Sequence, residues 1–313
     1  MRIAAPVNKV SVIVPTFQGE KRLPVILDSL HRQTFREFEL IISVDGSTDQ
    51  SLRVLRDETR FRDFKTLYEV NGGRAIAKNR GARVAKGEIL LFFDDDMILP
   101  EDCIQKHVDF HRRHLFSAIG GNPIALAREN SSDFMKYYYS VSRKWGSYTS
   151  ERVQLSPERF HLSAANFSIH RKLFDNLNGF DERLKDNEDL ELAYRIVTGA
   201  GTLFYDPDNI AYHNSDYNSL VGYIVRRREY HEGINALSKI HPYFQSRDMI
   251  RQDNMLKKLL YRLFGSYIML KIGNTLSKKN TFIPNKIKFV IFSLTIHSWS
   301  RIYSKKPISC SGK

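Results

Sequence analysis

The stretch ILLFFDDDMILPED at residues 89–102 places three consecutive aspartates directly after an apolar run. Residues 89–93 are branched or aromatic, which is typical of a buried strand. Three adjacent carboxylates repel one another, so a fold that keeps them together usually supplies a cation or several hydrogen bonds. The stretch therefore predicts a strand that ends at a site for Mg²⁺ or Mn²⁺. The alternative is a solvated acidic turn before a helix that starts near Pro100.

Strand-like and helix-like segments alternate before this stretch. Short apolar runs predict strands at residues 10–15, 38–44, 64–70 and 88–93. Helices are expected between them at about 20–33, 49–58 and 74–86. This alternation predicts an α/β fold with a mostly parallel central sheet and helices on both faces. Ligands bind at the carboxyl ends of strands in such sheets, which is where the aspartates lie.

The pattern after residue 102 is less regular. A helix is expected near 133–147, a strand near 165–169, a second helix near 187–198 and a strand at 201–206. From about Tyr217 the sequence becomes basic, aromatic and helix-periodic. We therefore expect a domain boundary at 216, followed by a basic helical extension.

Charge is distributed unevenly along the 313 residues. The whole chain has 48 Lys and Arg and 35 Asp and Glu, whereas residues 217–313 alone contain 18 basic and 4 acidic residues. Such a region could bind nucleic acid, anionic lipid or another acidic partner. A nucleic-acid-binding module would also present exposed aromatic residues in a recognisable pattern. No such pattern appears in this sequence, so we expect no nucleic acid partner.

Cysteine usage and the N-terminus both favour a cytoplasmic location. Cys103 and Cys310 lie far apart and have no metal-ligand spacing, which predicts neither a disulfide framework nor a zinc site. No apolar signal region precedes the first predicted strand, so no secretory leader is indicated.

A second acidic strand end lies in SVDGSTDQS at residues 43–51. Asp45 follows an apolar strand, Gly46 permits a sharp turn, and the next polar residues can cap a helix. Asp45 could accept hydrogen bonds from a base or a ribose. It could equally serve as a turn residue and helix cap.

Four ordered motifs resemble those of the inverting family 2 glycosyltransferases, which have the GT-A fold. They are VSVIVPTFQGE at 10–20, DGSTDQS at 45–51, NGGRAIAKNRGARVAKGEILLFFDDD at 71–96 and NFSIHRKLFDNLNGFDERLKDNEDLELAYRIVTGAG at 166–201. The resemblance covers about residues 8–213. It implies a nucleotide-diphospho-sugar transferase fold, with a catalytic domain at 1–216 whose nucleotide-binding half is about 8–100 and whose acceptor half is about 101–216.

The resemblance also assigns the donor site. It implies that Asp45 contacts uracil and that Lys78, in place of the family's arginine, faces the nucleotide or its diphosphate. Lys78 would act as a point charge rather than as a bidentate fork. The remaining residues implied to line the donor pocket are Pro15, Thr16, Phe17, Glu20, Ala165 and Asn166.

By the same resemblance, the aspartate cluster is the family's Asp-x-Asp motif. Asp94 would lie on the ribose side and near the metal, Asp96 would bind Mn²⁺ or Mg²⁺ directly, and Asp95 would lie between them. His213 matches the late histidine that some enzymes of this fold use as a further metal ligand, and a neutral imidazole suits Mn²⁺. A packed or surface histidine is the alternative.

The pair Glu188 and Asp189 resembles the family's acidic motif beneath the acceptor. Inverting transfer needs one carboxylate to accept the proton of the attacking hydroxyl. Asp189 is the expected base, with Glu188 as acceptor binder or alternate base. Both could instead complement the dipole at a helix N-terminus.

The basic extension at 217–313 suggests peripheral membrane contact. Residues 254–271 place leucines and aromatic residues on one helical face and basic residues opposite, which is typical of an interfacial helix. Residues 289–299 are too few to span a bilayer. The stripe could instead dock on the catalytic domain or on a second subunit.

We therefore expect a transferase that moves a single sugar from a nucleotide-diphosphate donor, a UDP-sugar, to a saccharide or lipid-linked saccharide hydroxyl. The resemblance implies cell-surface polysaccharide or glycan synthesis at the inner face of the membrane. A nucleotidyltransferase on a related fold, a nucleic-acid-binding protein and a catalytically silent relative are the alternatives.

Overall fold

The computed structural model describes residues 9–126, 128, 131–146, 149–199, 201–214, 219–246, 255–278 and 282–302. The chain forms two compact units. The first comprises Met1–Ile124 and Trp145–Ser215, and the second comprises Ala125–Lys144 and Asp216–Lys313. The sequence predicts that residues 125–144 belong to the N-terminal domain, whereas the structure groups them with the C-terminal residues.

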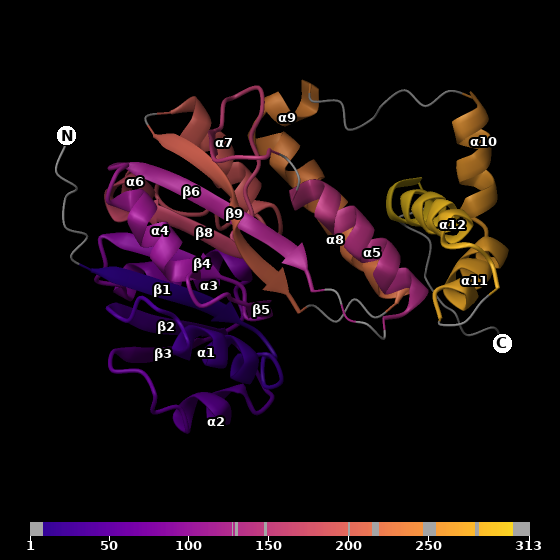
Figure 1. Ribbon diagram of the computed structural model, residues 1–313. Helices are drawn as coiled ribbons and strands as arrows, with labels where there is room; N and C mark the ends of the chain where they lie inside the picture. Colours follow the sequence, from indigo (N-terminus) through magenta and orange to yellow (C-terminus); the bar gives the residue numbers. More distant parts are fainter. Residues whose placement is uncertain are drawn as a thin grey trace. The chain divides into compact units, whose positions relative to one another are not determined.

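A twisted sheet forms the centre of the first unit, with strand order β3-β2-β1-β4-β8-β6-β9-β5 (Figure 1). The four N-terminal strands run parallel, which confirms the prediction for this half of the sheet. Their bounds are β1 (Val10–Thr16), β2 (Phe38–Asp45), β3 (Phe64–Glu69) and β4 (Ile89–Phe93). Their carboxyl ends carry Thr16, Asp45 and the aspartates that follow Phe93, so these residues share one edge.

Further pairings in the sheet are antiparallel. β8 (Asn166–His170) pairs with β4 and with β6 (Ser117–Ala125). β9 (Thr202–His213) pairs with β5 (Met97–Ile98) and β7 (Val153–Gln154). Since β5 begins directly after Asp96, its pairing with β9 brings the end of β9 to the aspartate cluster.

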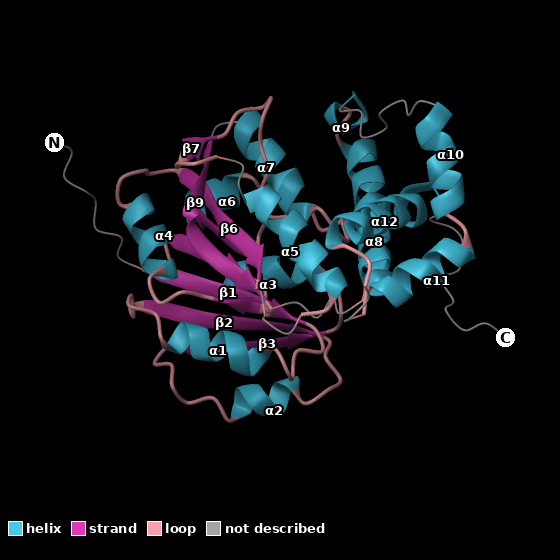
Figure 2. Ribbon diagram, turned by 45° about the vertical axis from the view of Figure 1, so that its right-hand side comes forward, coloured by secondary structure: helices cyan, strands magenta, loops and turns pink. Residues whose placement is uncertain are grey.

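Helices cover both faces of the parallel strands (Figure 2). On one face, α1 (Leu23–His31) and α4 (Cys103–His111) pack against alternate residues of β1 and β2 to form the main apolar core. On the other face lies α3 (Arg74–Val84), where a Cβ on Gly81 would come within 2.5 Å of Ile13. The absence of a side chain at Gly81 therefore allows close contact between helix and sheet.

The other helices of this unit are α2 (Ser51–Arg56), α6 (Arg171–Asn176) and α7 (Glu188–Thr198). Helix α7 begins at the acidic pair, as predicted. Cys103 is buried at the start of α4 and forms no disulfide, while Cys310 lies outside the described residues.

The second unit is helical in its described parts. Its helices are α5 (Asp133–Gly146), α8 (Leu220–Ile240), α9 (Tyr243–Ser246), α10 (Met255–Phe264), α11 (Tyr267–Leu276) and α12 (Asn285–His297), followed by a π-helical turn at Ser298–Ile302. Phe134, Phe292 and Trp299 centre its apolar core. The buried Lys288 ammonium forms an ion pair with Asp133 at 2.5 Å.

The prediction of one helix across residues 254–271 is wrong, because the helix ends at Phe264 and a new one starts at Tyr267. Gly265 lies at the break, and the Ser266 hydroxyl accepts a hydrogen bond from the Met269 N–H. Within the described part of the chain, no helix has the length and hydropathy that crossing a bilayer requires.

Candidate active site

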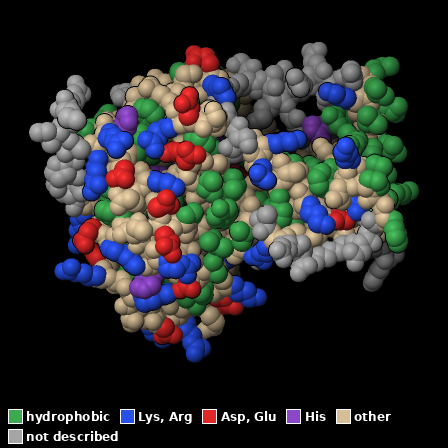
Figure 3. All heavy atoms as spheres, viewed as in Figure 1, with side chains coloured by type: hydrophobic (Ala, Val, Ile, Leu, Met, Phe, Trp, Pro, Cys, Tyr) green, Lys and Arg blue, Asp and Glu red, His purple; other side chains and the backbone are tan. Residues whose placement is uncertain are grey.

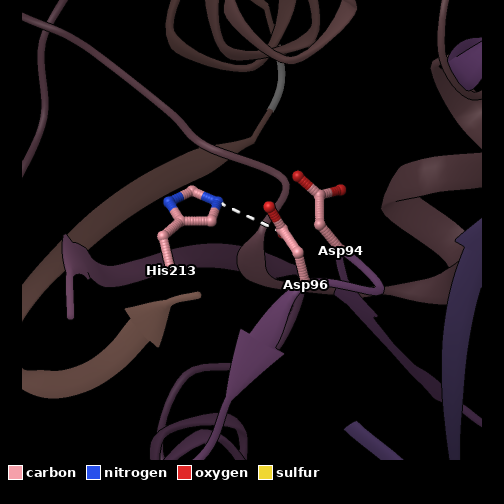
Figure 4. A group of neighbouring side chains, drawn as sticks. All are labelled: Asp94, Asp96 and His213. Atoms are coloured by element: carbon pink, nitrogen blue, oxygen red, sulfur yellow. Dashed lines mark ion pairs between the residues drawn. The ribbon is translucent and has the colours of Figure 1, made fainter. Parts of the chain in front are cut away.

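Asp94, Asp96 and His213 converge at the end of the parallel strands (Figure 4). Their nearest ligand atoms all lie within 4.8 Å of one another, and in the described residues this is the one such group of three. Met97 pairs with His213 across β5 and β9, and the Asn214 N–H donates to the Asp96 carbonyl at 2.8 Å. The backbone itself thus holds His213 beside the aspartates.

The electrostatics of this group fit a divalent cation. Burial raises the pKa of Asp96, the Asp94 carboxylate raises it further, and His213 partly opposes both. Two clustered carboxylates and an imidazole are suitable ligands for Mn²⁺ or Mg²⁺, which would relieve this repulsion. The residues present therefore fit the metal that the sequence predicted.

Asp95 points elsewhere. Its carboxylate accepts hydrogen bonds from Arg22 Nε at 2.9 Å, from Arg22 Nη2 at 3.0 Å and from the Thr16 hydroxyl at 2.5 Å. Arg22 Nη2 also donates to the Phe17 carbonyl at 2.7 Å. Asp95 and Arg22 together form a brace that ties the loop after β1 to the aspartate cluster. Phe17 itself is about half exposed at this loop.

Removing the brace should destabilise the first unit. Arg22→Gln leaves the buried Asp95 carboxylate without its bidentate partner, and we expect a loss of about 2 kcal/mol in the free energy of unfolding. Urea denaturation followed by circular dichroism measures this loss. Arg183→Gln is the matched control, because Arg183 makes a similar bidentate pair with Asp181 on an exposed loop. Equal midpoints for the two variants would contradict the brace.

Glu20 and Pro15 lie close to the brace but have structural neighbours. The Glu20 carboxylate accepts the Gln50 N–H at 3.0 Å at the start of α2, and the Glu20 N–H donates to Asp49 at 3.0 Å. Pro15 pairs with Ser43 between β1 and β2. Their contact with a nucleotide stays a prediction.

Asp45 organises the loop between β3 and α3. Its two carboxylate oxygens accept hydrogen bonds from the Gly72 and Gly73 N–H groups at 2.7 and 2.8 Å, and Arg80 forms an ion pair with it at 3.2 Å. Gly46, with φ +72°, lets the chain turn directly after it. Asp45 Oδ1 already accepts from both Gly72 and Arg80, whereas Oδ2 accepts from Gly73 and retains capacity for a hydrogen bond from a base.

Lys78 connects the aspartate cluster to the acidic pair on α7. Its buried Nζ donates to Glu188 Oε1 at 2.6 Å and lies 3.9 Å from Asp94 Oδ1. Burial acts to lower the pKa of Lys78, but the carboxylates of Glu188, Asp94 and Asp189 outweigh it and raise that pKa. Lys78 is therefore a fixed cation between the two acidic groups.

Asp189 differs from Glu188 in having partial access to solvent. Its carboxylate accepts hydrogen bonds from the Ala164 N–H at 3.2 Å and from the Leu190 N–H at 2.8 Å. Desolvation and the charge of Glu188 raise its pKa to about 7, against the effect of Lys78. A carboxylate with this pKa is suited to accept a proton near neutral pH.

The loop before α7 is held by Asn79 of α3. The Asn79 side chain donates to the Phe180 carbonyl at 2.9 Å and accepts the Phe180 N–H at 3.0 Å. Gly179, with φ +70°, makes the turn, and Arg195 Nη2 donates to its carbonyl at 2.7 Å. These contacts fix the position of the start of α7 and hence the position of Asp189.

Ala165 and Asn166 are buried at the start of β8. The Asn166 amide donates to the Asn209 carbonyl at 2.8 Å, and its oxygen accepts from His107 Nε2 at 2.8 Å. These contacts join β8 to β9 and α4. A substrate contact for either residue stays a prediction.

The family model for glycosyl transferase family 2 matches residues 11–177, more than half of the chain. The chain belongs to glycosyltransferase family 2. The matched residues contain β1 to β4, the brace, Asp45, Lys78 and the aspartate cluster. Glu188, Asp189 and His213 lie beyond the matched range.

Several glycosyltransferases are similar in sequence to this family 2 chain. YfnE of Bacillus subtilis, named an uncharacterized glycosyltransferase, is 37% identical over 107 residues, which are 33% of this chain and 27% of YfnE. TarS of Staphylococcus aureus, named a poly(ribitol-phosphate) beta-N-acetylglucosaminyltransferase, is 27% identical over 211 residues, which are 66% of this chain and 35% of TarS. The chain spans about a quarter of the length of the first curated relatives that it matches.

Solved structures show the GT-A fold of this family 2 chain. The crystal structure of TarS residues 1–349 matches with TM-score 0.54 and 19% identity, covering 95% of this chain and 91% of that one. The mannosyltransferase PcManGT of Pyrobaculum calidifontis matches with TM-score 0.61 and 17% identity, covering 95% and 88%. The predicted fold class is therefore confirmed.

Two features of the site escaped the sequence analysis. Arg22 was not singled out, because a single arginine at the start of a helix carries no signal for a partner 73 residues away. The contact of Lys78 with Glu188 joins residues 110 apart. The sequence offered one indirect signal for this contact. The family resemblance assigns both Lys78 and Glu188 to the same site.

Proposed function

We propose that this chain transfers one sugar, with inversion, from a nucleotide-diphosphate donor to a saccharide or lipid-linked saccharide hydroxyl. The observation that carries the proposal is the position of Lys78, 3.9 Å from Asp94 and 2.6 Å from Glu188. These contacts support one site that contains both the candidate metal group and the acidic pair with the candidate base. A metal-dependent inverting transfer needs both within one site.

In this proposal the residues have separate tasks. Asp94, Asp96 and His213 hold Mn²⁺ or Mg²⁺, which when bound supplies Lewis-acid stabilisation of the departing diphosphate. Asp189 accepts the proton of the attacking hydroxyl. Lys78 holds Glu188 in place beside Asp189 through its hydrogen bond, and Asp45 with its glycine loop lies where the base of the nucleotide would bind.

A UDP-sugar is the proposed donor. TarS has been solved in complex with UDP and with UDP-GlcNAc. PcManGT has been solved with GDP-Man and Mn²⁺, so structural neighbours also include a guanosine donor. Asp45 supports a uracil contact by its position in the motif. Saccharide assembly at the cytoplasmic side of a membrane, for cell-surface glycans, completes the proposal.

A donor screen tests this proposal. Thermal unfolding of the wild type is followed with UDP-, GDP- and dTDP-sugars, each with and without Mn²⁺, and slow donor hydrolysis is assayed in parallel. We expect a metal-dependent rise in melting temperature with UDP-sugars and release of free UDP. No response to any nucleotide, with or without metal, would reject the transferase proposal.

A further inference from the structure

Helix α10 turns its leucines toward solvent. Leu256, Leu259 and Leu263 are 65%, 64% and 56% exposed. The residue of α10 that is buried is Tyr261, whose ring stacks on His297 of α12 with centroids 4.2 Å apart. The leucines therefore do not form the face with which α10 packs inside the second unit.

Helix α11 adds to this exposed surface. Ile268 is 71% exposed and Ile272, one turn later, is 40% exposed, while Leu270 and Leu276 point into the core. Figure 3 shows hydrophobic side chains gathered along the edge of the second unit where α10 and α11 lie. We call Leu256, Leu259, Leu263, Ile268 and Ile272 the apolar face. Exposed apolar clusters of this kind mark interaction surfaces.

The charge around the apolar face has one sign. Residues 254–313 contain 12 Lys and Arg and not a single Asp or Glu. Lys257, Lys258, Arg262 and Lys271, on the same two helices, are exposed. The matching partner must therefore offer apolar groups and negative charge together.

We propose that the apolar face lies in the headgroup region of a membrane that contains anionic lipid. Its aliphatic side chains enter the acyl boundary while the neighbouring basic side chains bind phosphate headgroups. With ten residues each, α10 and α11 lie along the surface, since a spanning helix needs about 20 residues.

The two other candidate partners fit less well. A second copy of this chain would oppose the same basic helices to one another, which is electrostatically unfavourable. Nucleic acid would satisfy the charge but would leave the leucines without an apolar partner. Membrane binding involves neither donor nor acceptor, so the proposal does not depend on the transferase reaction.

Vesicle co-sedimentation of the full chain tests the proposal. Vesicles of phosphatidylcholine alone are compared with an equal mixture of phosphatidylcholine and phosphatidylglycerol. We expect binding to the mixed vesicles, weakened by salt. The variant Leu256→Gln, Leu259→Gln, Leu263→Gln should bind at least about 50-fold more weakly. Replacing Lys257, Lys258 and Arg262 by Gln should weaken binding by about fivefold per residue.

A matched control distinguishes binding through the apolar face from nonspecific hydrophobic binding to vesicles. Val70, Val84 and Leu115 are exposed apolar residues of the first unit, and their triple Gln variant should bind vesicles like the wild type. Circular dichroism verifies folding of each variant. Equal binding by wild type and the leucine variant would overturn the proposal. The proposal would also be overturned if the wild type did not bind vesicles but formed a dimer in analytical ultracentrifugation that the leucine variant did not form.

Discussion

We expect Asp189→Asn to slow sugar transfer by about 10²- to 10⁴-fold, the usual contribution of a general base. The carboxylate has a pKa of about 7, because desolvation and Glu188 disfavour its charge. It can therefore accept the proton of the acceptor hydroxyl at neutral pH. Steady-state kinetics with the donor found by the screen measure kcat, while the dissociation constant for UDP should stay within about twofold.

The pH dependence of the wild type follows from the same group. Only the ionised form of Asp189 accepts a proton, so kcat/KM should rise with pH and level off above about pH 7. Asp189→Asn should lose this acidic limb. A profile that stays flat down to about pH 5 would contradict the assignment of Asp189 as base.

Stability should move in the opposite direction to activity. A carboxyl whose folded pKa is raised keeps its proton in the native state at a pH where the unfolded chain has lost it. Its contribution to stability is therefore lost as the pH rises toward 7. Asn resembles the protonated acid, so Asp189→Asn should melt at a higher temperature than the wild type above pH 7. The matched control Glu37→Gln, at an exposed carboxylate before β2, should change neither property. Joint loss of activity and stability in Asp189→Asn would indicate a structural role for Asp189.

Asp96→Asn should remove the response to divalent metal and lower kcat by about 10³-fold, because metal ions supply several kcal/mol to the stabilisation of the leaving diphosphate. Asp96 lies with Asp94 and His213 within 4.8 Å, and no other such trio occurs in the described residues. Mn²⁺ binding by isothermal titration calorimetry, with and without UDP, measures the loss directly. Chelation of metal from the wild type should reproduce the defect.

The control for this variant is Asp102→Asn. Asp102 is exposed before α4, and its partner is Lys106 at 3.0 Å. It should bind Mn²⁺ and turn over like the wild type. Unchanged Mn²⁺ binding by Asp96→Asn would show that the metal site lies elsewhere. The proposed stabilisation of the leaving diphosphate at this edge of the sheet would then be wrong.

The parallel half of the fold could be predicted because its signals are local. Strands β1 to β4 are short runs of branched and aromatic residues separated by helix-periodic segments. Strand β6 was missed because SAIGGNPIA contains two glycines and a proline, residues that are rare in strands. Strand β9 was predicted only to Asp206, before Pro207, whereas it continues to His213 and pairs there with β5.

The site divides in the same way. Asp45 and the aspartates after Phe93 could be placed from sequence, because strand ends are local features. The basic partners of the site's carboxylates could not be placed from sequence. Arg22 contacts Asp95, and Lys78 contacts Glu188, only after the sheet has formed. The same holds for α10, where periodicity found the leucine stripe but not that the stripe faces solvent.

The anomeric configuration of the first product tests the central claim most directly. The substrate is an α-linked UDP-sugar that raises the melting temperature in the donor screen, and the wild type hydrolyses it slowly. Proton NMR identifies the anomer of the released sugar before mutarotation. Direct attack with Asp189 as base predicts the β-anomer, and Asp189→Asn should not release it. Release of the α-anomer would contradict the account, because retention requires a different arrangement of groups from the one formed by Lys78, Glu188 and Asp189.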